Sequence, residues 1–132
     1  PTLIKKCFDA LDRRSDMLEV LAKGSATREF FYVEDAAEAI GPAADSYDKS
    51  EPVNIGAGFE ISIRELTELV AGLSGFSGKI VWDSSKPDGQ PRRMLDTSKA
   101  LKEFGFKAKT DLATGLKKTI AWYRDHRHLL NK

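Results

Sequence analysis

The stretch from residue 62 to residue 82 constrains the fold of this chain more than any other. Ser62 is followed three residues later by Glu65, and this pair matches a capping box, which predicts that a helix begins here. Apolar residues then recur at helical spacing, which predicts one buried face: Ile63, Leu66, Leu69, Val70 and Leu73. The residues Lys-Ile-Val-Trp at 79–82 predict a strand directly afterwards. A helix that leads into a strand predicts a fold that mixes α and β structure.

Three glycines, Gly72, Gly75 and Gly78, separate this helix from this strand at a spacing that some dehydrogenases use to bind a pyrophosphate. That chemistry needs the glycines after a strand and before a helix, so that the helix N-terminus faces the phosphates. Here the order is reversed, and we interpret the glycines as a helix end and a turn. Gly56-Ala57-Gly58 follows a predicted strand but lacks the third glycine, and we interpret it as a tight turn.

The rest of the chain alternates in the same way. Helices are predicted at 3–14, 35–47 and 98–104 and from a cap at Thr110 onward, and further strands at 18–21, 29–33 and 52–56. Pro42 should kink the second of these helices or split it in two. The segment 83–93 is predicted to be a polar loop. We expect a single domain over residues 1–132 of the α/β class (α+β in isolation), with short strands alternating with helices.

Composition limits the function. The chain has 132 residues, and 21 Lys plus Arg against 20 Asp plus Glu give a net charge of +1. This balance argues against a broad nucleic-acid or anionic-membrane surface, and no apolar run is long enough to cross a membrane. The single cysteine, Cys7, favours a reducing compartment, so we expect a cytoplasmic protein. His126 and His128 have no partners at metal-ligand spacing, so no metal site is expected.

A cationic loop is the first candidate site. Lys86, Arg92 and Arg93 fall within eight residues of a segment that two prolines stiffen and that Asp88-Gly89 turns. Guanidinium groups bind phosphate oxygens in pairs, and a rigid loop loses less entropy on binding. A diphosphate therefore fits here, with a solvated basic loop as the alternative.

Arg28 is the second candidate, because it stands where a polar turn enters an aromatic segment. A charge at such a place needs a partner. Glu29 as a salt-bridge partner and an anionic ligand are both open at this point.

A family resemblance connects these segments. The stretch Gly24 to Ala39, with Arg28-Glu29-Phe30 and Tyr32-Val33, resembles the REF-x-YV-x-D-x-A signature of extended short-chain dehydrogenase/reductases that act on nucleotide sugars, the NAD-dependent epimerase/dehydratase family. The segments 52–56 with 61–66, and 86–93 with 96–100, continue the resemblance in order. The loop at 85–93 is most similar to the SKPDG-x-PR loop of the GDP-L-fucose synthase subfamily.

This resemblance implies a small C-terminal substrate-binding lobe of a longer enzyme, whose N-terminal Rossmann domain holds NAD or NADP and carries a Tyr-x-x-x-Lys catalytic pair. The residues four positions after Tyr32, Tyr47 and Tyr123 are Ala, Glu and Arg, so this chain has no such pair. The chain alone is therefore expected to be inactive and to bind no cofactor, with the missing Rossmann domain as its partner and a homodimeric parent enzyme. A fragment of a generic nucleotide-sugar 4-epimerase or dehydratase, or a stand-alone nucleotide-binding or interaction module, are the alternatives.

The resemblance also implies roles for single residues. Arg28 and Arg93 would hold the diphosphate of a nucleotide sugar, with a GDP-sugar favoured, and Lys86 and Asp88 would lie at the same pocket. No catalytic residue is expected within the chain.

Two departures from the family pattern stand out: Leu21-Ala22 replaces a Trp-Gly pair, and Gly41-Pro42 interrupts a helix that is normally continuous. If the lobe packs on a Rossmann domain, the helices that begin near Leu3 and Ala36 should expose apolar surface here.

Overall fold

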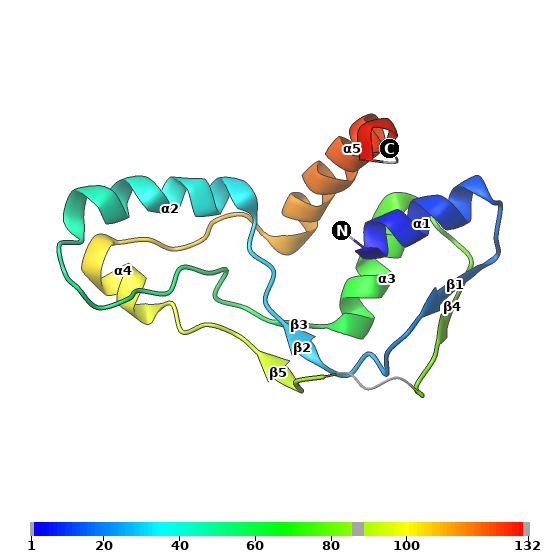
Figure 1. Ribbon diagram of the computed structural model, residues 1–132, viewed down its shortest axis with the longest axis horizontal. Coiled ribbons are helices and arrows are strands. Elements are labelled where there is room, and N and C mark those ends of the chain that lie inside the picture. Colours follow the sequence, from blue (N-terminus) through cyan, green and yellow to red (C-terminus); the bar gives the residue numbers. More distant parts are fainter. Residues whose placement is uncertain (1, 86–88, 131–132) are drawn as a thin grey trace.

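Helices and short strands alternate along the chain in the computed structural model, which describes residues 2–85 and 89–130 (Figure 1). In chain order they are α1 (Thr2–Asp12), β1 (Met17–Val20), β2 (Thr27–Arg28), α2 (Val33–Ser46), β3 (Ile61–Ser62), α3 (Ile63–Ser74), β4 (Lys79–Trp82), β5 (Arg92–Arg93), α4 (Ser98–Phe104) and α5 (Leu112–Leu130). The expected class, short strands alternating with helices, is confirmed. Among the described helices, none is long and apolar enough to cross a membrane.

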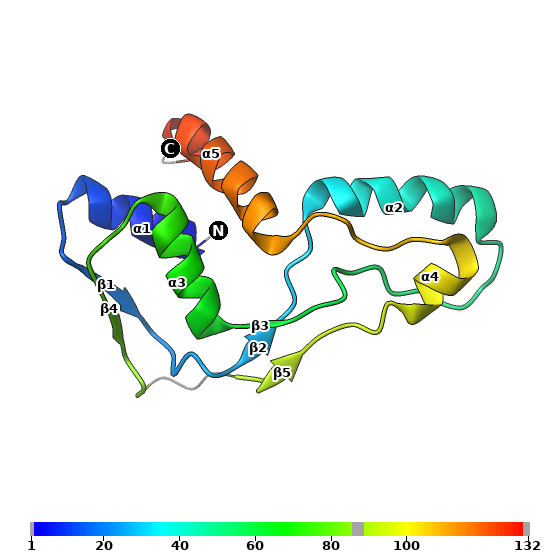
Figure 2. The ribbon, with the colours of Figure 1, turned by 180° about the vertical axis from the view of Figure 1, so that it is seen from behind.

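Two small sheets organise these elements. β1 and β4 pair in parallel, whereas β2 lies between β3, to which it is antiparallel, and β5, to which it is parallel. Figures 1 and 2 show α1, α3, α5 and the β1–β4 pair in one half of the molecule, and α2 and α4 in the other. The sheet of β2, β3 and β5 lies between the two halves, so the segments on which both predicted arginines lie meet at this junction.

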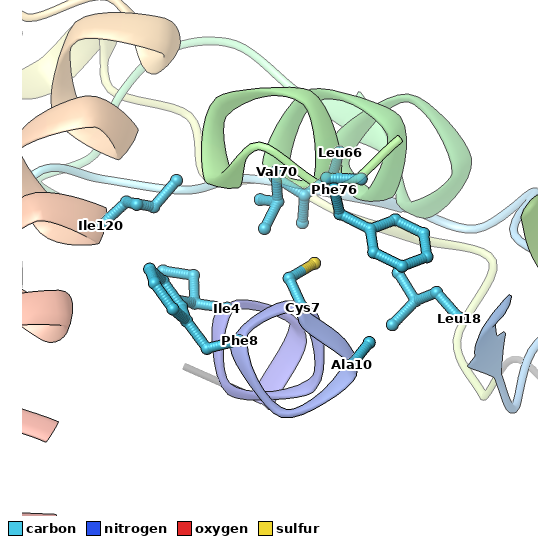
Figure 3. Close-up of a cluster of buried hydrophobic side chains, with 10 residues drawn as sticks. Ile4, Cys7, Phe8, Ala10, Leu18, Leu66, Val70, Phe76 and Ile120 are labelled. Carbon is cyan, nitrogen blue, oxygen red and sulfur yellow. The ribbon is translucent and has the colours of Figure 1, made fainter. Parts of the chain in front are cut away.

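The hydrophobic core belongs to one half only. It is formed mainly by Ile4, Cys7, Phe8, Leu18, Leu66, Val70, Phe76 and Ile120, which Figure 3 shows converging from α1, α3, α5, β1 and the segment just after α3. Burying a side chain of this size stabilises the fold by roughly 1.5–3 kcal/mol. In the α2 and α4 half the buried apolar side chains are the small Ala39 and Ala100. This second half therefore has little core of its own among the described residues.

A buried carboxylate stabilises the α2 half instead. Asp35, in the first turn of α2, is only 2% exposed. It accepts hydrogen bonds from the Thr110 hydroxyl at 2.7 Å and from the backbone amides of Thr110 and Lys109 at 2.9 and 3.1 Å. Burial raises the pKa of Asp35, but these hydrogen bonds together outweigh it, so its pKa lies below the ordinary value. Asp35 thus joins the start of α2 to the segment that leads into α5.

The segment from 62 to 82 folds as predicted. The Glu65 amide donates to Ser62 Oγ at 3.1 Å, the Ser62 amide donates to Glu65 Oε2 at 3.1 Å, and α3 begins at the next residue. Gly75 ends α3 in the left-handed region at a φ of 81°, and its amide donates to the carbonyls of Ala71 and Gly72. The interpretation of the glycines as a helix end is confirmed.

Three predicted elements are wrong. The aromatic residues 29–33 do not form a strand: β2 ends at Arg28, because beyond it the chain turns into α2 at Val33. Residues 52–56 are not a strand, since no described segment pairs with them. The last helix is not capped by Thr110, because the Thr110 hydroxyl donates to Asp35. Asp111 caps it instead: its carboxylate accepts a hydrogen bond from the Thr114 amide at 2.9 Å.

Two further expectations need correction. Pro42 does not split α2, which runs unbroken from Val33 to Ser46. Pro42 and Glu38, four residues before it, are both exposed, so water can solvate the carbonyl to which Pro42 cannot donate. The predicted loop 83–93 contains β5, because Thr27 donates to the Pro91 carbonyl at 2.9 Å and Glu29 to the Arg93 carbonyl at 3.2 Å. Cys7 is buried in the core as expected, and burial raises the pKa of its thiol.

Candidate functional site

Arg28 and Arg93 lie side by side. They are register partners on the parallel strands β2 and β5, as are Thr27 and Arg92 one residue earlier. Paired strands lie about 4.8 Å apart, and register partners point to the same face. Two like charges in this arrangement repel each other, so the face of the sheet that carries both guanidinium groups favours a bound anion. The sequence predicted both residues but not that they are neighbours.

Arg92 has a structural role on the same strands. Its Nε lies 2.8 and 3.0 Å from the two carboxylate oxygens of Glu60, and its Nη2 lies 2.6 Å from Glu60 Oε1. The Thr27 hydroxyl donates to the same carboxylate at 2.6 Å. Hydrogen bonds from Arg92 and Thr27 hold the pKa of Glu60 below its usual value. Arg92, one of the three cations of the predicted basic loop, is therefore neutralised by Glu60.

Glu29 holds three loops together. Its Oε1 accepts from the backbone amides of Ala57 and Gly58, the latter at 3.1 Å, and its Oε2 accepts from the Leu95 amide at 2.8 Å. The glycine turn at 56–58, which the sequence indicated only as a tight turn, is the backbone pocket that receives this carboxylate. A side chain at Gly56 would collide with Glu29 Oε1. No sequence signal pointed to this arrangement, because Glu29 and Leu95 are 66 residues apart.

A second cluster holds the chain just before β2. The Arg64 guanidinium lies over the Trp82 ring, 4.4 Å from its centroid, and donates to the Lys23 carbonyl at 3.2 Å. The Arg64 amide donates to the Gly24 carbonyl at 2.9 Å. Gly24 has a φ of 85°, and a Cβ there would lie 2.8 Å from the Trp82 ring. The turn that leads to Arg28 is thus packed against the end of β4, while Leu21, which replaces the family tryptophan, is 50% exposed.

A groove of about 750 Å³ opens next to the pair of strands. It is lined by Gly58, Arg92, Arg93, Met94, Leu95, Asp96, Thr97 and Ser98. Arg93 lies on its wall, whereas Arg28 is not one of its lining residues. The predicted site residues Lys86 and Asp88 lie outside the described residues. No group of three or more possible metal-ligating side chains occurs within residues 2–85 and 89–130.

The glycine segments of the chain do not fit a dinucleotide cofactor. Gly75 ends α3, so the helix presents its C-terminus, not its N-terminus, to the glycines. The amides of Ala57 and Gly58 already bind the Glu29 carboxylate. Neither of these two glycine segments therefore forms a backbone cradle for the pyrophosphate of a dinucleotide.

Comparisons with known proteins identify proteins to which nearly the whole chain is similar. No family model matches the chain. It is 46% identical over 123 residues to the probable GDP-L-fucose synthase 1 of Oryza sativa subsp. japonica, covering 93% of this chain and 37% of the relative. It is 43% identical over 123 residues to GDP-L-fucose synthase 1 of Arabidopsis thaliana, covering 93% of this chain and 38% of that protein.

A solved structure has the same fold. The GDP-L-fucose synthetase of Naegleria fowleri bound to NADP matches 97% of this chain and 39% of its own, with a TM-score of 0.89 and 27% identity. The chain spans less than two fifths of the length of each of these relatives. The order of its motifs, its fold and these similarities lead to one conclusion: the chain is similar in sequence to part of GDP-L-fucose synthases and has the fold of the C-terminal part of extended short-chain dehydrogenase/reductase enzymes.

Proposed function

We propose that this chain is the nucleotide-sugar-binding lobe of an NAD(P)-dependent GDP-sugar epimerase/reductase, and that Arg28 and Arg93 hold the substrate diphosphate. The observation that carries the proposal is the pairing of these two arginines in register on β2 and β5. A guanidinium group can donate paired hydrogen bonds to phosphate oxygens, and Arg28 also donates from Nη1 to the Thr27 carbonyl at 2.6 Å. Lys86 and Asp88, which precede β5 in the sequence, are proposed to lie at the same pocket.

The contribution of the lobe to the reaction is binding and orientation. Contacts to the diphosphate, which does not react, hold the sugar in one place and convert binding energy into rate. In the parent enzyme NAD or NADP supplies hydride transfer, and the proton-transferring residues belong to the other domain. The chain alone is proposed to be inactive, to bind no cofactor and to contain no catalytic residue.

A Rossmann domain is the proposed partner of the α2 half. Val33 and Ile40 on α2 are 70% and 65% exposed, and Leu101 on α4 is 52% exposed. These exposed apolar side chains give the two helices a surface that a neighbouring domain can cover. We further propose a homodimeric parent enzyme in the cytoplasm, consistent with the single buried cysteine.

Titration of the 132-residue chain with GDP tests the diphosphate site. Arg28→Ala and Arg93→Ala should each lower the GDP affinity about tenfold or more, because each removes charge-assisted hydrogen bonds. Arg124→Ala is the matched control: it removes an exposed arginine on α5 that pairs with Asp125, and the GDP affinity should not change. Amide chemical shifts at residues 27–29 and 92–94 should move on binding.

Parallel titration with UDP separates the substrate classes. Equal affinity for both nucleotides would support a generic nucleotide-sugar enzyme over a GDP-specific one. If saturating GDP and UDP leave the shifts of both strands unchanged, or if Arg93→Ala binds as tightly as the wild type, the diphosphate proposal is wrong.

A further inference from the structure

We infer that Glu29 is a positioning residue of the anion site: its carboxylate sets the register of β5 against β2 and so holds Arg93 beside Arg28. The inference rests on the proposed diphosphate function of that pair. The proposed role of Glu29 is to act through the backbone of the segment that follows Arg93.

The β2–β5 ladder is too short to keep its own register. It consists of two residue pairs, with flanking backbone hydrogen bonds from Thr27 to Pro91 at 2.9 Å and from Glu29 to Arg93 at 3.2 Å. A slip of one residue would turn Arg93 to the other face and place Arg92 opposite Arg28. Ladders this short depend on contacts outside the strands.

The Glu29 carboxylate supplies such a contact on the side of β5. The hydrogen bond from the Leu95 amide, 2.8 Å long, fixes the chain two residues beyond Arg93. A slip of one residue would move the Leu95 amide out of hydrogen-bonding distance of the Glu29 carboxylate. A hydrogen bond to a charged acceptor is worth more than an ordinary backbone bond, so this contact adds to the Glu60 contacts of Thr27 and Arg92 in holding the register.

The other carboxylate oxygen fixes Glu29 itself. It accepts from the amides of Ala57 and Gly58, and the Gly56 backbone approaches so closely that a side chain there would collide with it. The carboxylate therefore has one position, set by the glycine turn, from which it holds Leu95. Three amide donors compensate its charge.

Glu29→Gln is the direct test, because it keeps the shape of the side chain but leaves a single carbonyl oxygen to accept from the amides of Ala57, Gly58 and Leu95. In the 132-residue chain, amide hydrogen exchange at Ala57, Gly58 and Leu95 should become at least tenfold faster, while exchange at Val70 in the core is unchanged. The GDP affinity should fall about tenfold. Glu34→Gln, which removes an exposed carboxylate of α2 bonded to Lys118, is the matched control and should change neither measurement.

A double-mutant cycle distinguishes positioning from general stabilisation. If Glu29 acts through Arg93, Glu29→Gln should change the GDP affinity less than twofold in an Arg93→Ala background. A full tenfold loss in that background, or unchanged exchange at Leu95, would overturn the inference. If Glu29→Gln does not fold, Gly56→Ala displaces the carboxylate from the other side and should give the same two results. Wild-type protein that does not bind GDP would refute the proposed function, while the exchange at Leu95 still tests the register.

Discussion

Replacement of Asp35 is the sharpest test of how the two halves of this chain are held together. Asp35→Ala removes the acceptor for one hydroxyl and two backbone amides. The Thr110 hydroxyl can rotate toward other partners, but the amides of Lys109 and Thr110 are fixed by the backbone. An amide left buried without a partner costs about 1–3 kcal/mol. Because this half of the molecule has little core around it, we take about 1.5 kcal/mol for each amide, or about 3 kcal/mol in total.

This loss is a large part of the stability of a small domain, about 5–15 kcal/mol. Thermal unfolding followed by circular dichroism should show a melting temperature lower by roughly 12 °C, at about 4 °C per kcal/mol. Glu38→Gln, on the same helix, removes a carboxylate that is 54% exposed and pairs with Lys109, and it should change the melting temperature little. If Asp35→Ala is as stable as Glu38→Gln, the proposed link between the halves is wrong.

The pH dependence gives an independent measurement of the same link. The folded-state pKa of Asp35 is lowered, so its stabilising effect is fully present above its unfolded pKa, about 3.9, and is lost as the pH falls through the folded value. The stability difference between the wild type and Asp35→Asn should therefore be constant between pH 5 and pH 7 and should shrink at lower pH. If the stability difference between the wild type and Asp35→Asn stays constant down to pH 2, these hydrogen bonds do not hold Asp35 ionised.

Three further predictions concern single positions. Gly24→Ala should destabilise the chain and reduce GDP binding, because Gly24 has a positive φ and the new Cβ would meet the Trp82 ring. Gly72→Ala, with open space around it in α3, should instead stabilise the chain by about 0.5–1 kcal/mol. Urea unfolding of both variants measures these changes in the free energy of unfolding. Ser62→Ala should cost about 1 kcal/mol by loss of the α3 cap, measured in the same way, and an unchanged midpoint would contradict the capping box. The Cys7 thiol should react with a thiol reagent only as fast as the core opens, and immediate labelling of native protein would refute its burial.

The elements that the sequence predicted well are those with local causes. The start of α3 depends on Ser62 and Glu65, which are one helical turn apart, and its end depends on the backbone freedom of Gly75. α4 ends in the same way at Gly105, in the left-handed region at a φ of 69°. Such signals involve residues within a few positions of each other, so they can be recognised in a sequence without knowledge of the fold.

The site shows what local signals cannot determine. Sequence reasoning selected Arg28 and Arg93 but treated Arg92 as an equal cation, and only the register of β5 against β2 separates the arginine that faces Arg28 from the one that pairs with Glu60. Residues 29–33 have strand propensity, yet the chain turns into α2, because pairing requires a partner strand that lies beside them.

The chemical types needed to bind a nucleotide diphosphate, and the order of the elements that carry them, are determined by the sequence itself. The tertiary structure alone decides that Glu29 receives the amides of Gly58 and Leu95, and that Asp35 receives those of Lys109 and Thr110. The physical reason is that these hydrogen bonds join residues as far as 75 positions apart. They form only after helices and strands have packed, and nothing in the neighbouring residues encodes them.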